Sequence, residues 1–133
     1  MSVLVVLLIG AAGGFGAVTR FVVDGVVRAR FATAIPWGTV TINVVGSGLL
    51  GLLTGVALGG GVPQELQLAA GVGFLGGFTT FSTASVETVR LIQSGRVGRG
   101  LVNALGTAVL ALVAAAAGIV VGAVLVGADL VGG

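Results

Sequence analysis

The stretch that decides the fold is GGFTTFSTAS, residues 76–85, which interrupts an uncharged apolar run from Leu66 to Val86. That run is long enough to cross the hydrocarbon core of a bilayer as a helix, which takes roughly 20 residues. Adjacent glycines and closely spaced hydroxyls make a poor membrane helix, because Ser and Thr side chains bond to carbonyls one turn back and bend it. Irregular backbone at this depth persists only where it is buried in protein or lines a wet cavity. Two interpretations follow: a glycine kink with self-satisfied hydroxyls, or a broken helix whose freed carbonyls bind a cation.

The rest of the chain is equally apolar. Of its 133 residues, 56% are hydrophobic and 8% are charged, and the mean hydropathy is +1.24. A soluble domain carries about a quarter charged residues, so the few charges here cannot cover a globular surface in water. We therefore expect an all-α membrane protein, a single transmembrane domain over residues 1–133 that lies in the cell (plasma) membrane.

Charges and turn residues divide the chain into four apolar segments. The segments show no alternation of period two, so membrane-spanning β-strands are not expected. Nothing before Arg20 is basic, as the start of a secretory signal peptide would be. We expect four transmembrane helices, the third broken near its middle, with spans near 3–27, 37–59, 65–93 and 99–126.

Several kinds of site are excluded by residue types that the sequence lacks. It contains neither His nor Cys, which excludes serine–histidine catalysis, imidazole or thiolate metal sites, and disulfides. All six basic residues are Arg, and they form no dense cluster, so no nucleic-acid partner is expected. We expect no enzyme activity and therefore no catalytic residues.

Many of the 26 glycines are spaced four residues apart. In lipid, helices associate through close backbone approach, which small residues permit. The spacing leaves two interpretations open, packing within one four-helix bundle or packing between subunits of an oligomer. The pairs are Gly10 and Gly14, Gly51 and Gly55, Gly73 and Gly77, and Gly118 and Gly122.

A few polar residues stand out from this apolar background. Asn43 lies within the second span, where an amide without a hydrogen-bond partner is costly. Its side chain either makes an interhelical hydrogen bond or lines a pore as a donor to an anion. Arg20 is either an interfacial residue or an arginine in a wet vestibule that concentrates anions, and Asp24 lies one turn on as an available partner. Glu87 and Arg90 are expected to form a solvated pair at the interface.

Three motifs together resemble the Fluc (CrcB) family of fluoride channels. They are GxxGAVTR near the start, PWGTVTINVVGS in the second span and GFLGGFTTFSTASVE in the third. The resemblance covers nearly the whole chain, with four spans in matching places. It implies a fluoride-selective channel subunit that exports cytoplasmic fluoride and relieves fluoride toxicity. It also implies an antiparallel dimer with two narrow pores and a structural Na⁺ at the dimer axis.

The resemblance assigns roles to individual residues. The backbone carbonyls of Gly76 and Thr79 would hold the Na⁺, and Arg20 would be the vestibule arginine. A phenyl ring has a positive edge, which Phe81 can offer to an anion. The residues that would line the pore are Asn43, Thr80, Phe81, Ser82 and Thr107.

The chain departs from the family pattern at three positions. Ala84 stands where the family usually has a second phenylalanine, and Asn103 and Ala111 replace a tyrosine and a serine of the fourth span. These changes leave open the alternative that this chain is a non-conducting partner subunit of a heterodimeric fluoride channel. A small multidrug exporter is a further alternative, but it would need an acid within a span, and the middle of every span is free of acids.

The arginines of the loops are distributed unequally. The loops after the first and third spans share one side of the membrane and hold all five of them, whereas the other side holds none. The positive-inside rule then predicts one fixed topology with both termini outside. A chain that inserts both ways would have balanced loops, so we expect the natural partner to be a second, oppositely oriented homologue. The five are Arg28, Arg30, Arg90, Arg96 and Arg99.

Overall fold

The computed structural model describes residues 1–33 and 35–132, with the side chains of 128–131 left out. Every regular element within these residues is a helix. In chain order they are α1 (Val3–Arg30), α2 (Trp37–Leu58), α3 (Gln64–Gln67), the π-helical segment η1 (Leu68–Leu75), α4 (Gly76–Phe78), α5 (Phe81–Gln93) and α6 (Val97–Gly132).

The prediction of four spans with a broken third one is confirmed. Helices α1, α2 and α6 are each long and apolar enough to cross a membrane. The remaining span consists of α3, η1, α4 and α5 in succession, each too short to cross alone. The outer spans are longer than predicted. Helix α1 continues to Arg30, where Arg28 and Arg30 lie in its last turn and favour the negative end of the helix dipole.

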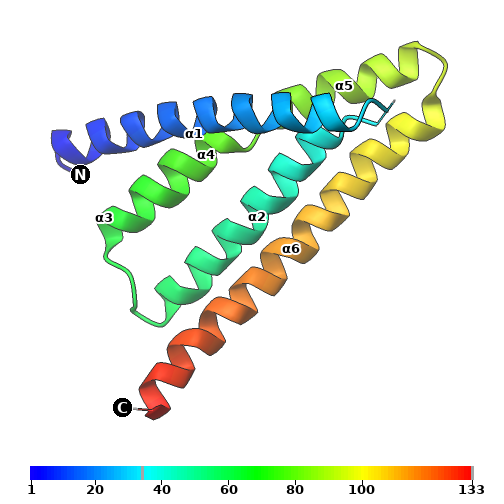
Figure 1. Ribbon diagram of the computed structural model, residues 1–133. Helices are drawn as coiled ribbons and strands as arrows, with labels where there is room; N and C mark the ends of the chain where they lie inside the picture. Colours follow the sequence, from blue (N-terminus) through cyan, green and yellow to red (C-terminus); the bar gives the residue numbers. More distant parts are fainter. Residues whose placement is uncertain (34, 133) are drawn as a thin grey trace.

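The helices form two packed layers that share one end (Figure 1). Helices α2 and α6 lie side by side along their lengths, and α1 packs across η1 and α4. Both termini and the α2–α3 connection lie at one end of the spans, while the α1–α2 and α5–α6 connections lie at the other.

Glycines allow the backbones of α2 and α6 to come into direct contact. A methyl group added at Gly51 would collide with the carbonyl of Ala115, and one at Gly118 with the carbonyl of Gly48. The two remaining members of these pairs, Gly55 and Gly122, are packed in the same way. These glycines therefore serve packing within the bundle, one of the two interpretations left open by their spacing.

Glycines also join α1 to the first half of the third span. A methyl group at Gly77 would collide with the carbonyl of Gly13, and one at Gly73 would lie 2.8 Å from the carbonyl of Ile9. Gly10 and Gly14 differ, because a methyl group at either would meet nothing within 4 Å. Three of the four glycine pairs thus pack helices of this chain, and the fourth lies on an open face of α1.

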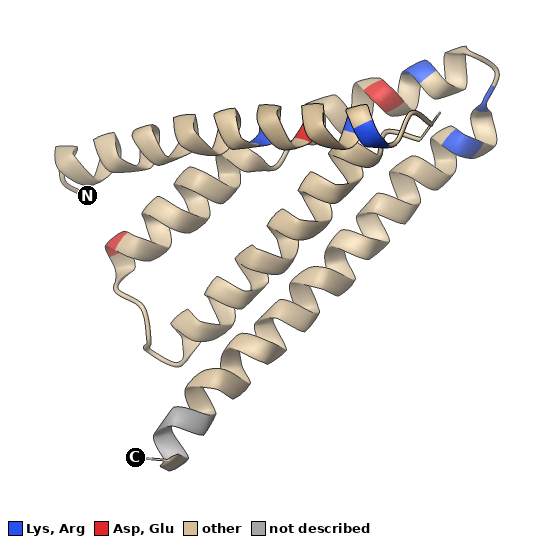
Figure 2. Cartoon of the chain, in the orientation of Figure 1, with Lys and Arg blue, Asp and Glu red and all other residues tan. Residues whose placement is uncertain are grey.

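Charged residues gather at the end where α1 meets α2 and α5 meets α6 (Figure 2). Two loop arginines end α1, one lies in the last turn of α5, and two lie at or just before the start of α6. At the opposite end, Glu65 lies in the short helix α3. The five loop arginines on which the topology prediction rests therefore lie at one end of the folded chain, and the opposite end has none of them.

Candidate functional site

The third span is interrupted by two residues of extended backbone. Helix α4 ends at Phe78, and α5 begins at Phe81. Between them Thr79 has φ −76° and ψ 156°, and Thr80 has φ −147° and ψ 118°. The break is thus a true interruption, with two helix ends facing each other inside the protein, and not a glycine kink.

The side-chain amide of Asn43 holds this break in place. Its Nδ2 donates to the carbonyl of Thr80 at 2.9 Å, and the N–H of Thr80 donates to its Oδ1 at 2.8 Å. Both backbone groups of an extended residue are therefore satisfied by one side chain of α2, which removes the penalty for irregular backbone in an apolar environment. Asn43 makes an interhelical bond, one of the two roles considered for it.

The break frees two backbone carbonyls from their usual helical partners. In a continuous helix, the N–H of Thr80 would donate to the carbonyl of Gly76, and that of Thr83 to the carbonyl of Thr79. Here the first N–H donates to Asn43 and the second to Oγ1 of Thr80, at 3.2 Å. Gly76 also faces open space, since an added methyl group would meet only the carbonyl of Gly71, at 3.8 Å. Hard cations prefer oxygen ligands such as backbone carbonyls, so the carbonyls of Gly76 and Thr79 fit the predicted Na⁺ site.

Hydroxyl groups continue along α5 from the break. Thr80 is the N-cap of α5, and its hydroxyl also donates to Oγ1 of Thr83 at 3.1 Å. Ser85 donates to the carbonyl of Phe81 at 2.9 Å, and Thr88 to that of Ala84 at 2.8 Å. These bonds to the carbonyl one turn back use the hydroxyl protons of Ser85 and Thr88, so toward other groups the two hydroxyls act as acceptors.

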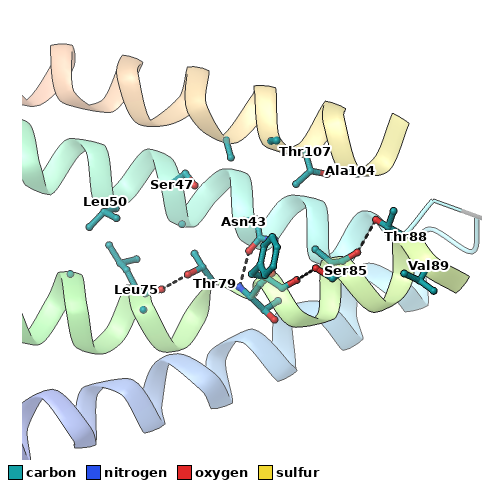
Figure 3. A pocket seen from close by; sticks show the side chains of 18 residues that line it. Asn43, Ser47, Leu50, Leu75, Thr79, Ser85, Thr88, Val89, Ala104 and Thr107 are labelled. Atoms are coloured by element: carbon teal, nitrogen blue, oxygen red, sulfur yellow. Dashed lines mark hydrogen bonds between the residues drawn. The ribbon is translucent and has the colours of Figure 1, made fainter. Parts of the chain in front are cut away.

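A groove of about 620 Å³ runs beside the break, between α2, the third span and α6 (Figure 3). Figure 3 shows Asn43 and Ser47 of α2, Thr79 at the break and Thr107 of α6 around it. None of the described residues that line the groove is charged. Its wall is mostly apolar, with hydroxyls and one amide as its polar groups.

The groove gathers most, but not all, of the predicted site residues. Phe81 lines its edge and is 88% exposed, so its ring projects from the surface of the chain. Ser82 is exposed and Arg20 is half-buried on α1, and neither lines the groove. The predicted residues that do line it are Asn43, Gly76, Thr79, Thr80, Phe81 and Thr107.

Two departures from the family pattern lie in the groove, and the third does not. Ala84 and Ala111 line it. Asn103 is only 4% exposed and donates to Oγ1 of Thr88 at 2.9 Å, while its Oδ1 has no hydrogen-bond partner within the described part of the chain. Asn103 therefore supports a hydroxyl of α5 instead of lining the groove itself.

Two lining residues of α5, Ser85 and Thr88, were not among the predicted site residues. They follow Phe81 at four and seven residues, so all three lie on one face of the helix. Applying helical periodicity from Phe81 onward would have identified them.

The prediction that Asp24 has Arg20 as its available partner needs correction. Asp24 Oδ2 accepts from Nε of Arg28 at 2.8 Å. Both arginines lie one turn from Asp24, but Arg28 is closer to the helix end, where it also meets a second carboxylate, that of Glu87. The extra partner favours Arg28, because one guanidinium can serve two acids with its fork of donors.

The prediction of a solvated pair between Glu87 and Arg90 is wrong. Glu87 Oε1 accepts from Nη2 of Arg28 at 2.6 Å and from the hydroxyl of Thr39 at 3.1 Å. The side chain of Glu87 is only 11% exposed. It faces α1 and α2 across the bundle, whereas Arg90 lies on an exposed part of α5.

Comparison with known proteins agrees with the motifs. Residues 7–119 match the family described as CrcB-like protein, Camphor Resistance (CrcB). The chain is 51% identical over 122 residues to fluoride-specific ion channel FluC 1 of Leifsonia xyli, a match that spans 92% of this chain and 89% of the relative. It is 47% identical over 112 residues to FluC 2 of Cutibacterium acnes, with coverage of 84% and 91%. It is 40% identical over 121 residues to FluC of Thermus thermophilus, with coverage of 91% and 97%.

These relatives are channels and not enzymes, and the match to them extends through all four spans. The expectation of a membrane protein without enzyme activity agrees with both findings. The chain is therefore a multi-pass membrane protein that belongs to the CrcB (FluC) family.

Proposed function

We propose that this chain is a subunit of a fluoride-selective channel through which cytoplasmic fluoride leaves the cell. The observation that carries the proposal is the uncharged groove of hydroxyl and amide groups beside the break in the third span. Fluoride is small and strongly hydrated, so a selective path must replace its water with short hydrogen bonds. Neutral donors suit this task, because conduction requires binding that is strong enough for entry and weak enough for exit.

The donors that the groove offers come from three elements. A side-chain amide has two N–H groups, and Asn43 uses one of them on Thr80, which leaves the other for an anion. Thr107 adds a hydroxyl from α6. Phe81 adds the positive edge of its ring. Ser82 lies outside the groove, with its hydroxyl 3.4 Å from that of Thr80.

In this proposal an antiparallel second subunit closes the groove, and a structural Na⁺ lies at the dimer axis. The exposed ring of Phe81 supports the first part, since 88% exposure suits a side chain that a partner covers. The freed carbonyls of Gly76 and Thr79 support the second, because they would hold the cation. Na⁺ would supply fixed positive charge beside the groove and satisfy carbonyls that the break leaves without donors.

A non-conducting partner subunit is the second candidate function. Ala84 and Ala111 favour it, because they line the groove where the family resemblance indicates larger or polar side chains. The structure speaks against a multidrug exporter. Asp24 and Glu87 are both paired with Arg28, and none of the described acidic side chains lines the groove.

Ion flux from liposomes tests the proposed function. Vesicles that contain the purified chain together with any partner subunit that it requires, and that are loaded with equal fluoride and chloride, should release fluoride on dilution and retain chloride. Both ions are to be followed with ion-selective electrodes. Equal release of the two ions would contradict the proposal. Fluoride release that needs a second homologue and is unaffected by Asn43→Ala in this chain would favour the non-conducting partner.

The unequal loop charges lead to a prediction about orientation. The end that carries the loop arginines should face the cytoplasm in every copy, with both termini outside. An impermeant reagent applied to intact cells should then label tags at both termini. In an antiparallel dimer this fixed orientation requires an oppositely inserted homologue as partner. An even mixture of orientations, with full fluoride flux from this chain alone, would instead show a dual-topology homodimer.

A further inference from the structure

Side chains of three helices meet at the basic end of the bundle, outside the groove. Arg28 of α1 contacts Glu87 of α5 through Nη2, at 2.6 Å. Thr39 of α2 donates its hydroxyl to the same oxygen of Glu87, at 3.1 Å. Glu87 therefore joins α5 to both neighbouring helices at one point.

Among the described residues, side chains of α2 form hydrogen bonds to α5 or its N-cap at two places, and Thr39 with Glu87 is the second of them. Thr39 and Asn43 lie one turn apart on α2. Asn43 bonds to Thr80, the N-cap of α5, and Thr39 bonds to Glu87, seven residues further along. Asn43 holds the start of α5, and Thr39 holds its middle. Together with the packing of α5 against α6, which includes the hydrogen bond from Asn103 to Thr88, the two contacts define the rotation of α5.

The rotation of α5 determines which side chains face the groove. Phe81, Ser85 and Thr88 recur at helical spacing and line it. Glu87 precedes Thr88 by one residue and therefore lies on the adjacent face of the helix, toward α2. A turn of α5 by a fraction of a revolution would move the groove-lining hydroxyls out of place.

Glu87 can hold this position only with a cationic partner. Thr39 is 2% exposed and the side chain of Glu87 11% exposed, so the carboxylate lies away from water, where a charge is stable only when paired. Arg28 is that partner. Its side chain is 54% exposed and reaches Glu87 from the surface of the bundle.

The guanidinium of Arg28 is itself oriented before it meets Glu87. Asp24 accepts from its Nε at 2.8 Å. The other oxygen of Asp24 is packed against Gly38 in the first turn of α2, where an added methyl group would collide with it. Asp24 thus directs the terminal nitrogens of Arg28 toward α5.

We propose that Arg28 is a positioning residue for the ion path: by holding Glu87, it sets the rotation of α5 and hence the face that α5 presents to the groove. The inference rests on the proposed function, in which the groove is the path of fluoride. Arg28 does not line the groove and acts through Glu87.

Three substitutions at two positions test the role of Arg28 in flux. Arg28→Met preserves length and removes the charge, and it should lower fluoride flux by about tenfold, because it leaves the Glu87 charge buried alone. Arg28→Lys restores a cation but not the fork of donors that serves Asp24 and Glu87 together, so flux should recover only in part, to a level between those of Arg28→Met and the unaltered chain. Arg30→Met removes the same charge from the same end of α1 and is the matched control, with unchanged flux.

A distance measurement separates positioning from other effects. The chain has no Cys, so spin labels can be placed on Val26→Cys and Val86→Cys alone. Diluting the labelled chain with unlabelled chain isolates the separation of α1 and α5 within one subunit. Both positions are exposed, at 52% and 49%. The distance distribution should shift or broaden with Arg28→Met, change less with Arg28→Lys and remain unchanged with Arg30→Met. Adding Glu87→Gln to Arg28→Met should restore it in part, because the lone buried charge is removed.

The outcomes distinguish this inference from the proposed function. An unchanged distance distribution in Arg28→Met would overturn the positioning role, whether or not flux falls. A shifted distribution in Arg28→Met supports the positioning role even if the unaltered chain releases no fluoride, and that second result would count against the proposed function alone.

Discussion

Replacing Asn43 with alanine is expected to reduce fluoride flux by well over tenfold. The substitution removes the amide that pairs with both backbone groups of Thr80. Each group that is left buried without a partner costs about 1–3 kcal/mol, so the break can no longer keep its extended geometry. It also removes the amide N–H that the proposed path offers to fluoride.

The design of the Asn43 experiment depends on where the side chain makes its contacts. Asn43 bonds to α5 of its own chain, so dimer assembly should be largely retained, and cross-linking should detect it. Thr54→Ala is the control on the same helix, because Thr54 is exposed and bonds only to the carbonyl of Leu50. Full fluoride flux in Asn43→Ala would contradict both roles of this residue.

Replacing Gly76 with leucine is expected to abolish most of the flux without unfolding the chain. Within the chain a methyl group at Gly76 meets only one carbonyl, at 3.8 Å, so the fold tolerates the added side chain. The leucine would instead occupy the space where we place Na⁺ and the second subunit. Overpacking of this kind costs about 1–3 kcal/mol, which corresponds to a loss of about fivefold to 150-fold in the fraction of dimer and hence in flux.

Neighbouring substitutions are the controls for Gly76. Gly77→Ala should damage the fold itself, because its methyl group collides with the carbonyl of Gly13 in α1. Thr79→Ala should be milder than Gly76→Leu, since it keeps the backbone carbonyl and removes only a hydroxyl that bonds to Leu75. Thermal unfolding in detergent and size-exclusion chromatography, with and without Na⁺, separate these cases. Unaltered flux and dimer content in Gly76→Leu would contradict the proposed axial site.

The spans and the break could be predicted because both depend on local properties of the sequence. Uncharged runs of sufficient length predict where the chain crosses the membrane, and the hydroxyls that follow Gly76 and Gly77 predict where a helix fails. Tertiary packing then decided between alternatives that local sequence left open. The amide of Asn43 favours a broken helix over a kink, since it replaces the bonds that the break removes.

The partners of the charged residues could not be predicted in the same way. Spacing along one helix makes Arg20 and Arg28 equal candidates for Asp24, and it makes Arg90 a candidate for Glu87. The choice depends on how α1 and α5 cross, which brings Arg28 within 2.6 Å of Glu87. A contact between residues so far apart in sequence depends on how the third span packs against α1, where Gly77 of α4 lies against the backbone of Gly13.

The central claim is that the uncharged groove beside the break conducts fluoride and rejects chloride. It is tested most directly by the reversal potential across a planar bilayer that contains the protein, with fluoride on one side and chloride on the other. The account predicts a potential far from zero, with the sign of a membrane permeable to fluoride alone, and loss of the current in Asn43→Ala. A reversal potential near zero, with comparable currents carried by the two ions, would contradict it.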